Sequence, residues 1–294
     1  MKDNRKTFLK CLGVGLALVL SFGVMVSGGE AETYPQRVIS MSPHFTEIVY
    51  DIGAQDQLIG VTDFCKFPPE ARKKEKIGGF FNPNFEKIVS LKPDLALLVP
   101  FYGQTIESFR QLHIPVVVRD DSTIQEVLDT YDVLGEKLGH EARARTAKKK
   151  LEDRLDAVRQ KAGGRQPVAI LFVVGHSIGG LQQIYAAGTN SFVGEIIALA
   201  GGKNILAGTK IPFPLVSKEQ LIKQDPEVIV DSMPNDEATG DTIEKAKMAW
   251  GQLPSLKAVR NHHVYFLKQD EYLIPGPTMV GLAEYLSKIF DENR

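Results

Sequence analysis

The sequence predicts an α/β fold of two Rossmann-like lobes with mostly parallel sheets, joined by a single long helix. Three observations support this prediction. Short apolar runs alternate with amphipathic stretches, a charged helical segment lies near the middle of the chain, and the segments on either side of it resemble each other. Alternating strands and helices indicate parallel sheets, and a chain of 294 residues is long enough for two lobes.

The first 31 residues have the pattern of a secretory signal peptide. A basic start, Lys2 to Lys10, precedes a continuous run of apolar and small residues from Cys11 to Val26, and Gly29-Glu30-Ala31 supplies small residues around a cleavage site. We expect cleavage after Ala31 and export of residues 32–294. The alternative is an uncleaved membrane anchor, although the run is somewhat shorter than the roughly 20 residues that span a bilayer.

Charge and cysteine content narrow the possible functions. The formal net charge of −1 falls to near −3 when the four basic and two acidic residues of the signal are removed. The mature chain therefore lacks the basic footprint of a nucleic-acid-binding protein. Cys65 is its one cysteine, so no intrachain disulfide can form and chain size must supply the stability.

Apolar runs of strand length and amphipathic stretches divide the first lobe, residues 32–140. We expect strands at Arg37–Met41, Leu58–Val61, Leu95–Val99 and Val116–Val118, and helices at Thr46–Ile52 and Glu126–Leu138, both followed by glycine. The second lobe, residues 164–294, repeats the scheme. We expect strands at Val168–Val174, Val228–Val230 and Val264–Leu267, and helices at Glu195–Leu199 and Val280–Phe290.

The segment between the lobes predicts a linker helix over residues 141–163. Glu141 to Lys161 is rich in charged residues and alanine, contains no Pro or Gly, and has apolar residues at spacings of three and four. This pattern indicates one long helix with a single apolar stripe. A helix is stiffer than a Gly/Ser linker, so we expect the lobes to swing little.

An internal echo supports the two lobes. Glu86 to Asp94 matches Glu219 to Glu227 at an offset of 133 residues, with a glutamate at the start of a short helix and a proline before a buried strand. Glu47 to Gly53 similarly matches Glu195 to Gly201. Glu86 and Glu219 suit the first turn of a helix, or they form one exposed charge per lobe for docking on a pseudo-symmetric basic partner.

Aromatic residues gather in loops after strands or beside Pro and Gly. Because clefts between lobes are preferred ligand sites, we interpret these rings as flat, rigid contacts for a bulky ligand. They are Phe64, Phe67, Phe80, Phe81, Phe101, Tyr102 and Phe213.

One segment allows an enzymatic alternative. Gly175-His-Ser177-Ile-Gly179 fits the G-x-S-x-G elbow of serine hydrolases, with Asp231 and His262 or His263 downstream. The elbow must run into a helix, but a loop and a short strand are expected after it.

His262 and His263 would point to opposite faces of a strand, which makes them a poor metal chelate, and we expect no metal site. The acidic run from Asp231 to Asp241 is interpreted as a solvated loop.

Taken together, several motifs resemble the solute-binding proteins of ABC importers for cobalamin, ferric siderophores and haem, with the closest likeness to the vitamin B12 branch. They follow the family order over nearly all of the mature chain. These motifs are Arg37 to Pro43 with Thr46-Glu47, Gly60 to Pro69, Asn84 to Asp94, Ala200 to Asn204, Ile211 to Glu219, and Pro275 to Pro277.

The resemblance implies a non-enzymatic periplasmic receptor, monomeric and without a catalytic cofactor, that binds cobalamin or a related corrinoid. It implies delivery of the ligand to a permease dimer that works with ATPase subunits. Arginines of the permease would pair with Glu86 and Glu219. Thr278 departs from the family, which usually has Arg after Gly-Pro. A ferric siderophore or haem is the alternative ligand; a siderophore binder would show several arginines, and Arg119 is the nearest. The expected ligand contacts are Phe64, Phe80, Phe81, Tyr102, Phe213 and Asp270.

Overall fold

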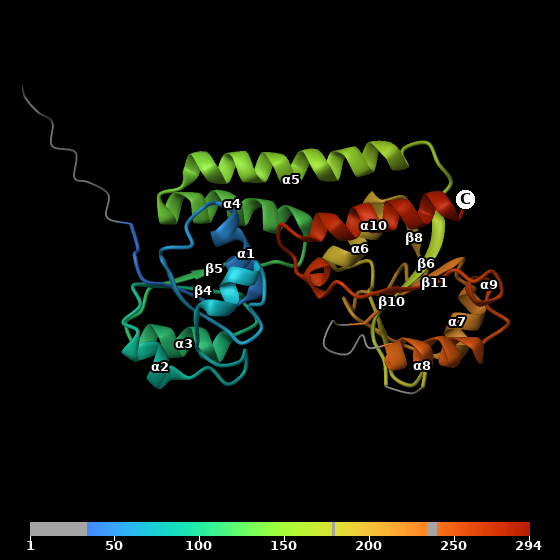
Figure 1. Cartoon of the computed structure of the whole chain (residues 1–294), viewed down its shortest axis with the longest axis horizontal. Coiled ribbons are helices and arrows are strands. Elements are labelled where there is room, and N and C mark those ends of the chain that lie inside the picture. Colours follow the sequence, from blue (N-terminus) through green and yellow to red (C-terminus); the bar gives the residue numbers. More distant parts are fainter. Residues whose placement is uncertain (1–33, 178–179, 234–239) are drawn as a thin grey trace, which may run out of the picture. The chain divides into compact units, whose positions relative to one another are not determined.

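The computed structural model describes residues 34–177, 180–233 and 240–294, and the chain from Tyr34 to Arg294 forms one compact unit. The signal peptide and the cleavage site at Ala31 lie outside the described residues. Two β-sheets, each covered by helices, confirm the α/β fold class (Figure 1).

The first sheet is parallel throughout and has the strand order β3-β2-β1-β4-β5. Its central strands are mostly apolar and buried, and β4 is apolar and buried throughout, as expected for strands covered on both faces. The strands are β1 (Val38–Ser40), β2 (Leu58–Val61), β3 (Glu75–Lys76), β4 (Leu95–Leu98) and β5 (Val116–Val118). The helices of this half are α1 (Pro43–Asp51), α2 (Phe85–Ser90), α3 (Gly103–Gln111) and α4 (Ile124–Leu138), with the 3-10 helix η1 (Pro69–Lys73).

The second sheet is mixed and has the order β11-β10-β6-β7-β9, with β8 also paired to β6. Strands β8, β10 and β11 run parallel to their neighbours, whereas β7 is antiparallel to both β6 and β9. The strands are β6 (Val168–Gly175), β7 (Ile184–Ala186), β8 (Gly202–Asn204), β9 (Leu215–Val216), β10 (Val228–Ser232) and β11 (Val264–Leu267). The helices are α6 (Phe192–Leu199), α7 (Lys218–Gln224), α8 (Gly240–Gly251), α9 (Lys257–Arg260), η2 (Asp270–Leu273) and α10 (Met279–Glu292).

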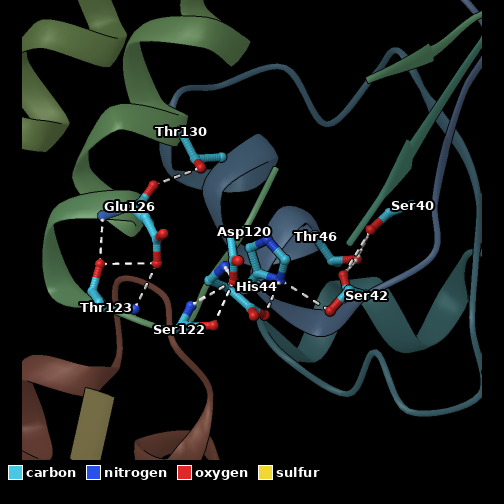
Figure 2. Close-up of polar contacts among 10 residues, drawn as sticks. Ser40, Ser42, His44, Thr46, Asp120, Ser122, Thr123, Glu126 and Thr130 are labelled. Atoms are coloured by element: carbon cyan, nitrogen blue, oxygen red, sulfur yellow. Dashed lines mark hydrogen bonds and ion pairs between the residues drawn. The ribbon is translucent and has the colours of Figure 1, made fainter. Parts of the chain in front are cut away.

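Helix ends follow local chemistry that explains small shifts from the predicted bounds. The helix expected from Thr46 begins at Pro43, because proline at the first helical position already has a helical φ. α4 begins two residues before Glu126. The Thr123 hydroxyl accepts the Glu126 N–H, and the Glu126 carboxylate accepts the Thr123 N–H (Figure 2). Helix α4 ends at Leu138 and is capped by Gly139, whose φ of +75° is left-handed.

The predicted long helix is α5 (Glu141–Ala162), and its apolar stripe packs against both halves of the protein. Ala147, Leu151, Leu155 and Val158 are buried together with Ala144. α5 lies alongside α4 and also contacts α10 and α6, so it packs on helices of both halves (Figure 1). One continuous hydrophobic cluster contains this stripe and the inward faces of both sheets. The division into separate lobes at residues 140 and 163 stays a prediction.

We expect Leu155→Ala to lower the free energy of unfolding by about 2–5 kcal/mol, because Leu155 is 2% exposed within the shared cluster. Urea unfolding of residues 32–294, followed by circular dichroism and by the fluorescence of Trp250, measures the loss. Exposed Lys150 on the same helix is the matched control, and Lys150→Ala should change stability by less than about 0.5 kcal/mol. A loss below about 1 kcal/mol for Leu155→Ala would contradict the role of the stripe.

Candidate functional site

Loops at the carboxyl edge of the first sheet hold a cluster of aromatic rings. This aromatic cluster contains Phe64 after β2, Phe80 and Phe81 after β3, and Phe101 and Tyr102 after β4. Phe64 and Phe80 stack with their ring centroids 4.2 Å apart, and Phe80 lies 5.9 Å from Tyr102. Phe81 meets Phe101 and Tyr102 edge-on at 6.0 and 6.3 Å. Four of the six predicted ligand contacts are therefore brought together.

The aromatic cluster faces solvent over much of its area. Phe81 is 80% exposed, Phe101 is 76% exposed and Phe64 is 49% exposed. Burial, with Asp121 nearby, raises the pKa of Tyr102 to about 12, so its phenol is neutral at physiological pH. The carboxyl edge of a parallel sheet is where open α/β folds bind ligands, and exposed rings there offer a rigid apolar platform.

Asp270 and Phe213 come from the second half of the chain. Asp270, which follows β11, lies near Lys66, which follows β2; the Lys66 Nζ and Asp270 Oδ2 atoms are 4.0 Å apart. This pair links the loops of the two halves beside the aromatic cluster. Phe213 is 44% exposed and precedes β9; among the described residues no ring contact joins it to the aromatic cluster. The ligand-contact role of all six residues stays a prediction.

A polar network behind the aromatic cluster joins the ends of β1 and β5. The His44 Nδ1 atom is 3.1 Å from Asp121 Oδ2 and 2.9 Å from Ser42 Oγ, so it lies within hydrogen-bonding distance of both. Ser42 is tied in turn to Ser40, whose hydroxyl accepts a bond from Thr46 (Figure 2). No role for His44 was evident from the sequence, because its partner Asp121 is distant along the chain.

Cys65 lies between Phe64 and Lys66 but points into the protein. Its side chain is fully buried, and its sulfur is 3.2 Å from the Thr62 hydroxyl. Burial raises the pKa of the Cys65 thiol, so the thiol stays protonated at neutral pH.

At the carboxyl edge of the second sheet, His176 and Trp250 hold a buried carboxylate. Asp231 Oδ2 lies 2.9 Å from His176 Nε2 and accepts the Trp250 indole N–H at 2.8 Å. The hydrogen bond to Asp231 raises the pKa of His176 to about 9. The interpretation of Asp231 as part of a solvated loop was wrong: it lies on β10 and is fully buried. Residues 234–239 lie outside the described residues.

The geometry around Ser177 does not assemble a hydrolase triad. Asp231 pairs with His176, whereas His263 Nδ1 lies 3.3 Å from the carbonyl oxygen of Glu227. His176 uses its other ring nitrogen on the Ser177 carbonyl at 3.1 Å, so neither nitrogen is available as a base for the Ser177 hydroxyl. A strand, β7, is the next regular element after Ser177 among the described residues, and Gly179 lies outside them.

Glu86 and Glu219 occupy equivalent, exposed positions. Each follows the first residue of a short helix, α2 or α7, whose N-cap is Asn84 or Ser217. Its own backbone N–H and the Ser217 hydroxyl lower the pKa of the Glu219 carboxyl. Among the described residues neither glutamate is in an ion pair.

The match extends to the residues that follow these glutamates. Ile88 and Leu221 are fully buried, whereas Val89 and Ile222 are 48% and 49% exposed. Each half therefore shows an exposed carboxylate and an exposed aliphatic side chain one helical turn apart.

A pocket of about 610 Å³ lies at the junction of the two halves. Glu47, Tyr50 and Phe67 line it from the first half, and Glu271 and Thr278 from the second. None of the six predicted ligand contacts lines this pocket.

Within residues 34–177, 180–233 and 240–294, no group of three or more His, Cys, Asp or Glu residues is placed to hold a metal ion. In the same ranges no helix has the length and apolarity to cross a membrane.

Comparisons with known proteins agree with this fold. Residues 38–271 match the family model described as periplasmic binding protein. A vitamin B12-binding protein of Vibrio cholerae is 28% identical over 257 residues, which cover 86% of this chain and 89% of the relative.

Two solved structures extend the comparison. The crystal structure of the periplasmic vitamin B12 binding protein BtuF of Vibrio cholerae has a TM-score of 0.76 at 27% identity, covering 88% of this chain and 98% of that one. The periplasmic heme-binding protein RhuT from Roseiflexus sp. RS-1 shares the fold with a TM-score of 0.74 at 24% identity, covering 88% and 98%.

The raised pKa of His176 predicts a titration that depends on Asp231. A histidine with a raised pKa stabilises the fold fully below pH 6.5, and this stabilisation is lost as pH rises through about 9. In Asp231→Asn we expect the pKa of His176 to fall towards 6.5, measured by NMR titration of the imidazole. Asp241→Asn, at an exposed aspartate of α8, is the control and should leave that titration unchanged. A pKa near 9 in Asp231→Asn would show that another group holds the proton.

Proposed function

Because the chain belongs to the periplasmic binding protein family, we propose that it is the receptor of an ABC importer that carries cobalamin or a related corrinoid. The observation that carries this proposal is the aromatic cluster at the carboxyl edge of the first sheet. Support also comes from the vitamin B12-binding relatives, which match most of the chain. Periplasmic residence after cleavage at Ala31, and action as a monomer, are part of the proposal.

A corrinoid suits this edge because it presents a broad ring system edged with neutral amides. The stacked rings of Phe64, Phe80 and Tyr102 supply flat apolar area for such a ligand. The Lys66–Asp270 pair lies beside them and offers a donor and an acceptor to amide groups at the rim.

The charge of the edge favours a corrinoid over a ferric siderophore or haem, the alternative ligands. An anionic chelate or a haem propionate is best met by several arginines. Here Arg119 follows β5, but Asp120 and Asp121 come directly after it, and Lys66 already faces Asp270. The carboxylates of these loops outnumber the cations, which disfavours a multiply anionic ligand.

Titration with cyanocobalamin tests this ligand assignment. We expect saturable binding at micromolar or lower concentration, followed by calorimetry or by the fluorescence of Trp250. Phe64→Ala should weaken binding at least about fivefold, since an aromatic contact at the centre of an interface contributes about 1–3 kcal/mol. Met248→Ala, which removes an exposed side chain of α8, is the matched control.

Haem and a ferric hydroxamate are titrated in parallel. Saturable binding of either one, without binding of cyanocobalamin, would replace the corrinoid by the alternative ligand. Equal affinity of Phe64→Ala and the unmodified protein for cyanocobalamin would remove the aromatic cluster from the site.

We further propose that Glu86 and Glu219 dock the receptor on two arginine-bearing surfaces of a permease dimer driven by ATPase subunits. The glutamates are exposed, equivalent in the two halves and outside any ion pair among the described residues. Val89 and Ile222 add one exposed apolar contact beside each charge. A charge with an adjacent apolar anchor, repeated once per half, fits a partner with matching two-fold repetition.

Reversal of both charges tests docking separately from ligand binding. We expect Glu86→Lys combined with Glu219→Lys to abolish ligand uptake by cells, because like charges would then meet at both contacts. Ligand affinity of the purified variant should change less than twofold. Glu107→Lys with Glu244→Lys, two exposed positions on α3 and α8, is the control for net charge. Collapse of ligand affinity in the first variant would place the glutamates in the fold or the ligand site instead.

A further inference from the structure

A buried carboxyl group connects the two halves of the chain. Glu47 lies on α1, and its Oε2 atom is 2.7 Å from the hydroxyl oxygen of Thr278, which directly precedes α10. The Thr278 N–H also approaches Oε2, at 3.4 Å. These two residues are 231 positions apart in the sequence, so the contact ties the first half to the second.

Both short contacts of the Thr278 hydroxyl are satisfied as hydrogen bonds when Glu47 carries a proton, whereas donation from Thr278 to Glu47 leaves the Glu271 contact without a hydrogen. The Thr278 Oγ1 atom lies 2.7 Å from Glu47 Oε2 and 2.6 Å from the carbonyl oxygen of Glu271. A hydroxyl carries one hydrogen and a carbonyl oxygen can only accept. If Thr278 donates to Glu271, the short contact with Glu47 is satisfied when the Glu47 carboxylic acid donates to Thr278. The result is a chain of two hydrogen bonds that runs from α1 to η2.

The burial of Glu47 agrees with a neutral side chain. It is 3% exposed, and its Oε1 atom has no hydrogen-bond partner among the described residues. An ionised carboxylate with an unsatisfied buried oxygen would be costly, whereas the carbonyl oxygen of a carboxylic acid tolerates this better. Desolvation by this burial raises the pKa of Glu47 to about 8. Gly276 leaves room for the group, since a Cβ there would lie 3.0 Å from Oε2.

The charged groups around Glu47 give it no cation of its own. Arg154 of α5 is the basic residue in this pocket, and its guanidinium donates to both oxygens of Glu284 on α10. Asp51 accepts the Tyr131 hydroxyl of α4 at 2.7 Å. Glu271 adds a further negative charge that favours the protonated form of Glu47. The remaining titratable groups near the junction are Tyr50, Tyr272 and, one turn earlier on α1, His44 paired with Asp121.

We propose that Glu47 is a positioning residue that acts through its proton: the neutral acid holds α1 of the first half to the segment before α10 of the second, and ionisation loosens this link. The proposal goes beyond the proposed function and holds whichever ligand the protein carries. In this proposal, the hydrogen bond between Glu47 and Thr278 sets the angle between the two halves.

The direction of the pH effect follows from the sign of the shift. A carboxyl with a raised pKa binds more protons in the folded than in the unfolded protein. Its stabilisation is complete below pH 4.5 and is lost as pH rises to about 8. The junction should therefore weaken in mildly alkaline solution, where most carboxylates no longer titrate.

A set of variants tests the proton directly. NMR titration of ¹³C-labelled glutamate carboxyls should show one group with a midpoint near 8, which disappears in Glu47→Gln. The glutamine amide can still donate to Thr278, so Glu47→Gln should keep its low-pH melting temperature through pH 9. The unmodified protein should lose several degrees over the same range. Thr278→Val, which removes the acceptor, should melt lower at every pH.

The angle between the halves is a readout that a merely stabilising contact would not move with pH. Spin labels at Gln111→Cys on α3 and Lys247→Cys on α8, both exposed sites, report the distance between halves. We expect the distance distribution to broaden between pH 6 and pH 9, and Glu47→Gln to prevent the broadening. A Glu47 midpoint near 4.5, or equal broadening in Glu47→Gln, would overturn the proposal.

Discussion

The burial of one apolar stripe on α5 is the constraint on which the structure depends. A helix with so many charged residues gains little from burial except along Ala147, Leu151, Leu155 and Val158. These side chains meet helices from both halves, so each half completes its core with the same surface. The two sheets consequently share one hydrophobic cluster, and large independent motion of either would expose it.

The aromatic cluster and the His176–Asp231 pair lie at or beyond the carboxyl ends of strands. Parallel strands end at one edge of a sheet, and the loops beyond that edge can vary without disturbing the core. The aromatic cluster uses the loops after β2, β3 and β4, and the His176–Asp231 pair uses the end of β6 and β10. Rigid strands below and exposed rings above give this edge a preformed apolar surface, which suits the proposed ligand contact.

Local patterns predicted the fold well, and contacts between distant residues were not predictable. Apolar runs predicted β2, β5 and β11 with their observed bounds, because the strands of a parallel sheet covered by helices are continuous apolar runs. β3 and β9 contain two residues each and leave no pattern to detect. Asp231 looked like a loop residue because it is an acidic residue at the end of an apolar run, yet its partners are His176 and Trp250.

The candidate site likewise contains residues that the sequence pattern indicates and contacts that only the fold shows. Loop aromatics could be found from their place after strands, and five of them meet in one cluster. The Glu47–Thr278 junction had a weaker signal: threonine after Gly-Pro, where the family resemblance implies arginine. Only the fold shows that this threonine meets a buried acid.

The burial of Cys65 determines how the thiol reacts with oxidants. Oxidants attack thiolates that they can reach, and this sulfur is neither ionised nor accessible. In the proposed periplasmic location, such a thiol is protected from forming cross-linked dimers.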